Sequence, residues 1–226
     1  MTDSLQNLLL VHAAQDTTRV NILNDLAAAW HRNDLAKALS YTTEAEQIAT
    51  NLGFEKGQAK SNLVKGKAQA FHSGYQEGME AYREALAKYD AIGLVKGRAE
   101  VYKEMGIYFH RRGEQPAAIA EYKKSLKDYE SANAREEAFD VLNRIGWSNI
   151  RAGDYEEALK YYEKAIENSE GIRNKTTLAY CFSDVGIIYT YLGNYYLALD
   201  YFKQSLAVGE KNNDGEAIAN TLGNMG

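Results

Sequence analysis

The residues that could carry out chemistry are few, and their spacing argues against a catalytic or nucleotide-binding site. A phosphate-binding loop needs four residues between its two glycines and a Lys-Ser/Thr pair after the second. Gly53 and Gly57 are separated by three residues, as are Gly93 and Gly97, and the pair recurs with the 40-residue spacing found below. The Gly-x-Ser-x-Gly sequence of serine hydrolases does not occur. We therefore expect a protein that is not an enzyme.

Side chains that bind metals are equally scattered. No two histidines stand at i and i+4, the spacing that would place two zinc ligands on one helix face. The single cysteine, Cys181, has no histidine nearby and excludes an intrachain disulfide framework. We expect no metal and no cofactor, a packing role for Cys181, and histidines at the surface or in a groove. The histidines are His12, His31, His72 and His110.

The composition is that of a soluble globular protein, with 45% hydrophobic and 25% charged residues among 226. A single proline leaves few turn signals for a β-sandwich or barrel. The formal net charge of −5 disfavours nucleic-acid binding, which would need a basic stripe. No apolar run approaches the roughly 18 residues of a membrane-spanning helix, so we expect no direct membrane insertion.

A repeat of 40 residues runs through the chain and must position any functional side chain. Glycines mark it at Gly66, Gly106, Gly146, Gly186 and Gly226. Columns of small and aromatic residues follow at Gly78, Ala118, Ala158 and Ala198, with Ala38 before them, and at Tyr82, Tyr122, Tyr162 and Phe202. A further small column holds Ala45, Ala85, Ser125, Ala165 and Ser205. Turn and helix-end columns hold Asn33, Ser73, Gly113, Gly153 and Gly193, and Gly53, Gly93, Asn133, Arg173 and Asn213. Such regularity without an insertion indicates stacked, equivalent units.

Each unit is predicted to contain two helices. Apolar or small residues recur at steps of three and four in Arg135–Arg151 and again in Tyr155–Glu170, the spacing of one helix face. Gly153 suits the left-handed end of the first helix, and Asp154 suits the cap of the second. Small residues at Ala158 and its equivalents would let neighbouring helices approach closely, with an aromatic ring beside them.

These columns resemble the tetratricopeptide repeat family in its longer variant, in which about six residues are added to the usual unit of about 34. The resemblance covers residues 17–226 and is strongest around Gly106, Gly146 and Gly186. It implies an all-α fold, a right-handed superhelical α-solenoid of antiparallel helix pairs. The first helix of each pair would line a concave groove.

We expect two parts in the chain. Residues 1–16 would form an N-terminal capping helix, and residues 17–226 would form the array, with five full 40-residue units and a truncated sixth. The sequence stops within the first helix of that sixth unit, which indicates a piece of a longer protein.

The groove-facing residues follow from the core positions of the best-defined helix. If Leu142, Ile145 and Gly146 face the core, the remaining face of that helix points into the groove, and the 40-residue offset gives the equivalent positions on neighbouring helices. The candidate ligand-binding residues are Lys103, Glu104, His110, Asn143, Arg144, Trp147, Asp184 and Ile187.

Two features of this face allow alternative interpretations. Trp147 is either an apolar anchor for a ligand or a residue buried between neighbouring helices. Glu104, Arg144 and Asp184 alternate in charge at 40-residue steps. They would either grip a ligand or pair with one another. The acidic residues argue against the C-terminal carboxylate ligand of heat-shock co-chaperones in this family.

The partner that we expect is a protein or peptide segment in the concave groove, with no nucleic acid. A homodimer through the open C-terminal end is a further hypothesis. Asp3-Ser4-Leu5, Asp16–Asn21 and Leu26-Ala27 resemble the start of bacterial arrays that precede histidine kinases, nucleotide cyclases or DNA-binding output domains. The resemblance implies the recognition or sensor part of a larger bacterial signal-transduction protein. The alternative is a free-standing cytoplasmic adaptor or co-chaperone. The location would be cytoplasmic as the sequence stands, or periplasmic if a signal peptide precedes it.

Overall fold

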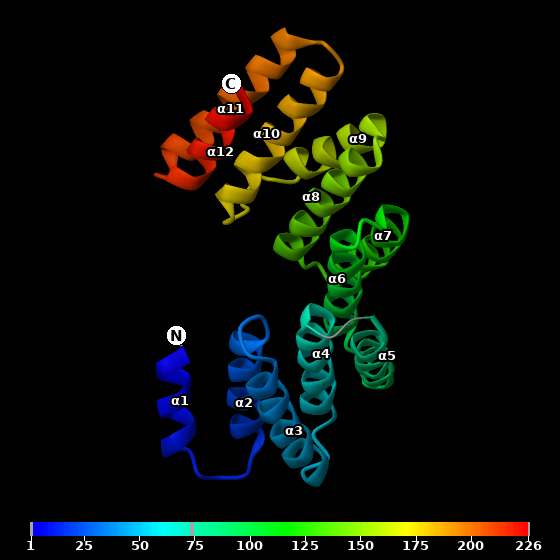
Figure 1. Ribbon diagram of the computed structural model, residues 1–226, viewed down its shortest axis with the longest axis vertical. Helices are drawn as coiled ribbons and strands as arrows, with labels where there is room; N and C mark the ends of the chain where they lie inside the picture. Colours follow the sequence, from blue (N-terminus) through cyan, green and yellow to red (C-terminus); the bar gives the residue numbers. More distant parts are fainter. Residues whose placement is uncertain (1, 73–74, 226) are drawn as a thin grey trace. The chain divides into compact units, whose positions relative to one another are not determined.

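The computed structural model describes residues 2–72 and 75–225, and this part of the chain contains twelve α-helices and no strand (Figure 1). The predicted all-α fold is therefore confirmed. The helices are α1 (Thr2–Val11), α2 (Thr17–Trp30), α3 (Leu35–Asn51), α4 (Glu55–His72), α5 (Tyr75–Ala91), α6 (Val95–Arg111), α7 (Gln115–Ser131), α8 (Arg135–Ala152), α9 (Tyr155–Glu167), α10 (Lys175–Tyr191), α11 (Tyr195–Lys211) and α12 (Gly215–Met225).

The helices belong to two compact units, the first ending at Tyr108 and the second beginning at Phe109. In the first unit, contacts join α1 to α2, α2 to α3, α3 to α4 and α4 to α5. In the second unit, they join each helix to the next from α7 to α12. Consecutive helices are connected by short turns, so neighbours such as α8 and α9 run antiparallel (Figure 1).

The first helices of successive pairs also touch one another directly. Contacts link α2 to α4 in the first unit, and α8 to α10 and α10 to α12 in the second. Each unit therefore has a wall built from its first helices, which we call the inner wall. The second helices α3, α5, α9 and α11 pack beside this wall.

The turns after α3, α5, α7, α8 and α11 end these helices as the sequence predicts. Gly53, Gly93 and Gly153 have positive φ angles of 63°, 64° and 81°. Asn133 and Asn213, in the same column as the first two glycines, both adopt φ of 53°. These are left-handed conformations that glycine and asparagine accept at the end of a helix. The turn residue Ser73 and the glycine Gly226 lie outside the described residues.

The glycine and aromatic columns meet in the core of each pair. A Cβ atom placed on Gly146 would lie 2.7 Å from the ring of Tyr162, and one on Gly186 would lie 2.6 Å from the ring of Phe202. Both rings are buried. The predicted reason for these columns is confirmed, because the absence of a side chain on the first helix makes room for the ring from the second.

Gly57 and Gly97, considered above for phosphate binding, serve the same purpose inside helices. A Cβ atom on Gly57 would collide with the ring of Phe54, and one on Gly97 would collide with the ring of Tyr89. Both rings come from the turn or helix just before the glycine. These glycines therefore allow close packing between consecutive pairs.

The predicted end of the second helix after Gly153 is wrong by three residues. We expected this helix to reach Glu170, but α9 ends at Glu167 and the connection continues to Asn174. Gly171 has φ of 78° within this connection, and the Asn174 side chain accepts a hydrogen bond from the backbone N–H of Thr177. The longer turn explains why Arg173 stands where other units have glycine or asparagine.

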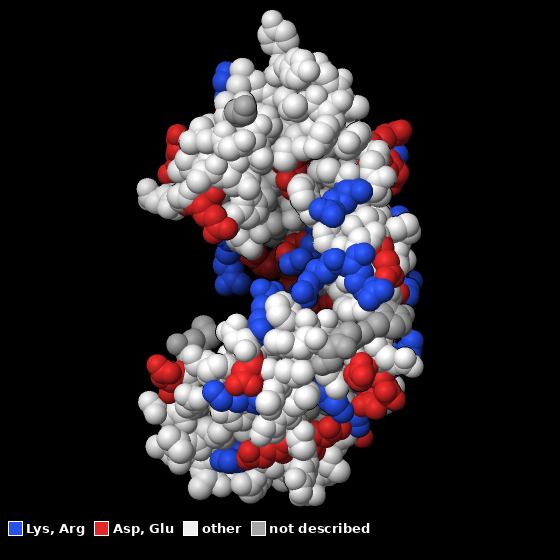
Figure 2. Space-filling view, viewed as in Figure 1, with Lys and Arg blue, Asp and Glu red and all other residues white. Residues whose placement is uncertain are grey.

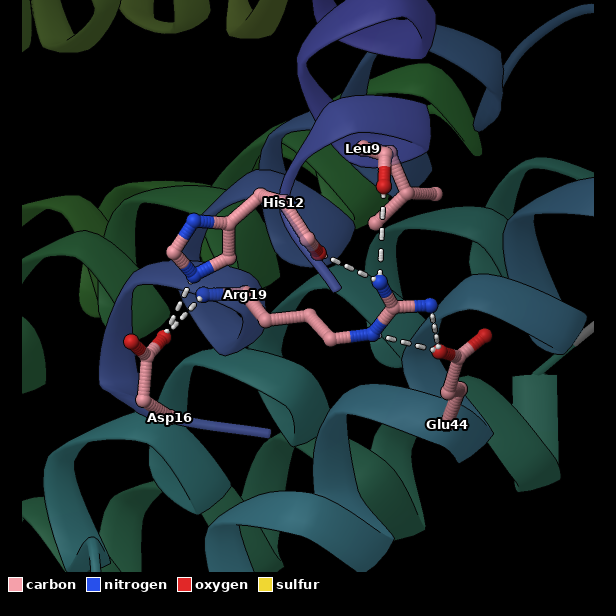
Figure 3. Close-up of polar contacts among 5 residues, drawn as sticks. All are labelled: Leu9, His12, Asp16, Arg19 and Glu44. Carbon is pink, nitrogen blue, oxygen red and sulfur yellow. Dashed lines mark hydrogen bonds and ion pairs between the residues drawn. The ribbon is translucent and has the colours of Figure 1, made fainter. Parts of the chain in front are cut away.

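Helix α1 is attached to the first unit by polar contacts (Figure 3) and by Leu9, which packs against a buried cluster of α2 and α3. None of its described side chains is fully buried. The Arg19 guanidinium donates to the carbonyl oxygens of Leu9 and His12, at 3.4 and 2.9 Å, and to Glu44 Oε1 of α3, at 2.7 Å. His12 Nε2 lies 2.9 Å from Asp16 Oδ1, and the same carboxylate caps α2 by accepting from Arg19 N. Arg19 thus joins the end of α1 to the α2–α3 pair.

Candidate binding surface on the first helices

The middle of α8 shows how the sequence separates the core from the inner wall. Val141 and Ile145 are fully buried, whereas Asn143, Arg144 and Trp147 are half-buried. The side chains of one helix therefore divide between two environments at steps of three and four residues. The same division on α6 and α10 leaves all eight candidate residues half-buried, that is, at the edge of the core and within reach of solvent.

Trp147 lies between the two environments that we had considered. It is not part of the fully buried core, and it is not among the strongly exposed apolar residues. A half-buried indole on a polar helix face has enough contact with the protein to be held in place, and it keeps apolar surface for a ligand.

Asp184 is held by groups from two other helices. The Tyr162 hydroxyl of α9 donates to Asp184 Oδ2 at 2.8 Å. Asn143 of α8 also donates to this carboxylate, and its amide lies 3.4 Å from the Cys181 thiol. Burial raises the pKa of Asp184 to about 7, although both hydrogen bonds oppose the increase. Near neutral pH this carboxyl group therefore changes between its neutral and its charged form.

The charged residues of the candidate surface have nearby partners. In the first unit, Glu104 forms an ion pair with Lys67 at 2.7 Å, and Lys103 forms one with Glu100 at 2.8 Å. In the second unit, Arg144 Nε pairs with Asp140 Oδ2 on the same helix at 2.9 Å. Glu104, Arg144 and Asp184 therefore each have a polar partner. The partner of Arg144 is on its own helix, and those of Glu104 and Asp184 are on other helices.

His110 is neutral on this surface at physiological pH. Its Nδ1 lies 2.9 Å from Ser148 Oγ of α8. Burial lowers the pKa of His110 below its ordinary value of 6.5, with smaller contributions from Arg151 and Arg144. It can therefore offer a ligand one donor or one acceptor, depending on its tautomer.

The hydroxyl of Tyr162 is a functional group that the sequence did not reveal. Its column was interpreted as packing, and the ring is indeed buried against Gly146. The equivalent residue Phe202 packs in the same way without a hydroxyl. The polar role of Tyr162 could have been suspected from Asp184, an acidic residue that stands 22 positions later on the adjacent helix.

A separate pocket of about 220 Å³ lies away from these residues, where α7 and α9 end and α8 begins. Its lining includes Tyr129, Phe139, Leu142 and the ion pair between Lys164 and Glu130. None of the eight candidate residues lines it, so the inner wall and this pocket are different features of the second unit.

Two expected absences can be examined only in the described part of the chain. Across residues 2–72 and 75–225, no three His, Cys, Asp or Glu side chains gather closely enough to hold a metal ion. Over the same residues, no helix combines the length and the apolar character needed to cross a bilayer. The single cysteine, Cys181, is buried, as predicted for a packing residue.

The repeat, the ring-on-glycine packing and the inner wall can now be compared with known proteins. A family model described as the SusR N-terminal TPR domain matches residues 2–219. The chain belongs to this family. The tetratricopeptide repeat resemblance drawn from the columns is thereby confirmed, and the chain is a helical-repeat scaffold of the kind that supports protein–protein interaction. A comparison with curated protein sequences finds no significant match.

Solved structures with the same fold include proteins with different descriptions. BtubC (BKLC) from P. vanneervenii has a TM-score of 0.76 at 18% identity, over 94% of this chain and 88% of its own. A signal transduction ATPase with numerous domains (STAND protein) with a tetratricopeptide repeat sensor, from Pyrococcus horikoshii, has a TM-score of 0.74 at 17% identity over 93% of this chain. A Rap protein complexed with Competence and Sporulation Factor has a TM-score of 0.67 at 13% identity over 92% of this chain.

The length of these proteins differs from that of the chain. The present chain spans 34% of the length of the STAND protein and 63% of the length of the Rap protein. At identities below 20%, the likeness shows a shared helical-repeat fold and no shared ligand.

Proposed function

We propose that this member of the SusR N-terminal TPR domain family is a non-catalytic scaffold that binds a protein or peptide segment on its inner wall. We further propose that it is the recognition or sensor part of a larger bacterial signal-transduction protein. The observation that carries the proposal is the half-buried Trp147 on the same side of α8 as the half-buried Asn143 and Arg144, with Asp184 of α10 hydrogen-bonded to Asn143. An indole on a helix side that also carries polar side chains offers an apolar anchor and hydrogen-bonding groups to one ligand.

The comparisons support this kind of function. The Rap protein was solved in complex with Competence and Sporulation Factor, and the STAND protein is described as having a tetratricopeptide repeat sensor. Each of these descriptions concerns the other protein. Together with the inner wall of this chain, they favour a binding module over a structural spacer.

Trp147→Ala tests the proposal. A library of random 12-residue displayed peptides is selected against the wild-type chain, and the affinity of the best binders is measured by calorimetry. We expect Trp147→Ala to weaken them at least tenfold, about 1.4 kcal/mol, with little change in the melting temperature.

The control for this experiment is Tyr196→Ala, because Tyr196 is an aromatic residue on the second helix α11 and is 92% exposed. This variant should bind like the wild type. Equal affinity of Trp147→Ala and the wild type would refute the role of Trp147. A large fall in melting temperature would instead place the indole among the residues that hold the fold.

A further inference from the structure

The pocket of about 220 Å³ where α7 and α9 end and α8 begins combines an apolar floor with charged side chains. Tyr129 of α7 and Phe139 and Leu142 of α8 form the floor, and each is only 2% exposed. Glu130 of α7 and Lys164 of α9 also line it. We call this cavity the α7–α9 pocket.

The start of α8 departs from the other first helices at two neighbouring positions, and both departures shape the pocket. Ala138, which lines it, stands where the other units have the larger residues Gln58, Arg98, Leu178 and Ile218. Phe139 stands where they have Ala59, Ala99, Ala179 and Ala219. A methyl group thus replaces a long side chain beside the cavity, and an aromatic ring replaces a methyl group on its floor.

Helix α9 departs from the other second helices beside the same pocket. Helices α3, α5, α7 and α11 end at equivalent positions, which are Asn51, Ala91, Ser131 and Lys211. Helix α9 ends at Glu167, four residues before the equivalent Gly171, and Asn168 just after its end lines the pocket. The opening is therefore particular to this helix pair and is not a general feature of the repeat.

The size and the floor of the pocket suit one aromatic ring with a short substituent. Apolar cavities of about 150 Å³ hold benzene, so a volume of about 220 Å³ leaves room for a few further atoms. The rings of Tyr129 and Phe139 offer a third ring the edge-to-face and offset contacts that aromatic groups prefer. An apolar lining with a few polar groups is typical of sites for small molecules.

The charged side chains of the lining favour a negative charge on the ligand. Lys164 Nζ pairs with Glu130 Oε1 at 2.8 Å, but each side chain is 46% exposed, so this ion pair contributes little and can exchange partners. Arg135, the second basic residue of the lining, donates from Nη2 to the carbonyl oxygen of Glu170 at 3.1 Å, which does not neutralise the guanidinium. Figure 2 shows Lys and Arg side chains gathered around α7 and α8.

We propose that the α7–α9 pocket binds a small aromatic carboxylate. Its ring would lie on Tyr129 and Phe139, in the space beside Ala138, and its carboxylate would pair with Lys164 and Arg135. None of the eight candidate residues of the inner wall lines this pocket. The proposal therefore does not rest on the binding of a peptide there.

Titration of the full chain with 3-phenylpropionate, followed by NMR of the ¹⁵N-labelled backbone, tests the proposal. We expect saturable shifts of the amides in residues 133–142 and 164–168, with a Kd of about 1 mM or tighter. Ala138→Leu introduces the residue that α10 has at Leu178, and it should weaken binding at least tenfold by filling the pocket. Lys164→Gln should weaken binding of the acid at least threefold and leave binding of the uncharged 3-phenylpropan-1-ol unchanged.

The matched control is Lys160→Gln, because Lys160 stands one turn earlier on α9, pairs with Glu156 and Glu157 and does not line the pocket. This variant and Trp147→Ala should both bind 3-phenylpropionate like the wild type. Circular dichroism checks that Ala138→Leu is folded, and Lys164→Gln tests the site at an exposed position. No saturable shift at millimolar concentration overturns the proposal, as does binding that a folded Ala138→Leu leaves unchanged. Equal affinity of the wild type for the acid and the alcohol overturns the carboxylate assignment.

Discussion

Single residues decide two properties of the second unit, how closely its helices pack and how it responds to pH. Gly146 has no side chain, and the Tyr162 ring occupies the space where one would be. The hydroxyl of the same tyrosine donates to Asp184 on α10, the first helix of the next pair. Tyr162 therefore connects a packing contact to a titrating group on the inner wall.

Gly146→Ala should destabilise the chain by about 1–3 kcal/mol, because the new Cβ forces the buried Tyr162 ring to move. The helix propensity of alanine offsets at most about 1 kcal/mol of this. Chemical denaturation measures the difference. The matched control is Gly223→Ala, since nothing lies within 4 Å of that position. A loss of equal size in both variants would contradict the close-packing explanation.

Asp184 should make stability depend on pH between about 4 and 7. Its pKa in the folded chain is about 7, above the ordinary value of 3.8, so the folded state holds a proton that the unfolded chain has already released. The stability of the wild type therefore falls as pH rises through this range, by at most about 1.4 kcal/mol per pH unit from this group, and levels off above pH 7.

Asp184→Asn removes this titration and keeps an oxygen that can accept from Tyr162. The melting temperature of the variant, relative to that of the wild type, should increase between pH 5 and pH 8. Titration of all other groups largely cancels in this difference. A difference that is independent of pH would show that the Asp184 carboxyl group is not perturbed.

At the scale of elements, α1 differs from the other helices in how it is attached. The other helices bury columns of side chains, whereas α1 contributes Leu9 to the edge of a core cluster and depends on the Arg19 guanidinium for its end. A helix of ten residues has little stability of its own in water. Its order therefore depends on these few contacts.

Arg19→Gln should release α1 and leave the rest of the first unit folded. Hydrogen exchange of the backbone amides in residues 5–12 should accelerate at least tenfold, while amides of α4 keep their protection. Lys37→Gln is the control, because it also removes an ion pair, with Asp34 at 3.6 Å, and the Lys37 ammonium lies over the Trp30 ring of α2. Unchanged exchange in residues 5–12 would show that apolar contacts alone hold α1.

At the scale of the whole molecule, the 40-residue period was sufficient to predict the two-helix unit and its core. Because the same residue types recur in every unit, the columns locate the helix ends better than one helix alone could. The predicted end of α8 is within one residue of the observed end. The connection after Glu167 escaped prediction because it breaks the column at Arg173. The attachment of α1 was not predicted, because Arg19 belongs to none of the repeated columns and its contacts have no counterpart in the other units.

The candidate surface was less accessible from the sequence. The helix period identified which side chains lie between core and solvent, and all eight candidates are half-buried. Their partners depend on packing between helices, so the Tyr162–Asp184 hydrogen bond and the altered pKa of Asp184 could not be predicted from spacing. The assignment of these residues to ligand binding stays a prediction for the Trp147 experiment.

The direct contact between successive first helices has a consequence for how such a protein can evolve. Along α8, the buried residues that pack against neighbouring helices stand on one side. A different side carries the half-buried Asn143, Arg144 and Trp147. Mutations on the wall can accumulate while the glycine and tyrosine columns are kept. Relatives with the same architecture can therefore diverge in what they recognise, and a library randomised only at wall positions should yield mostly folded members with new specificities.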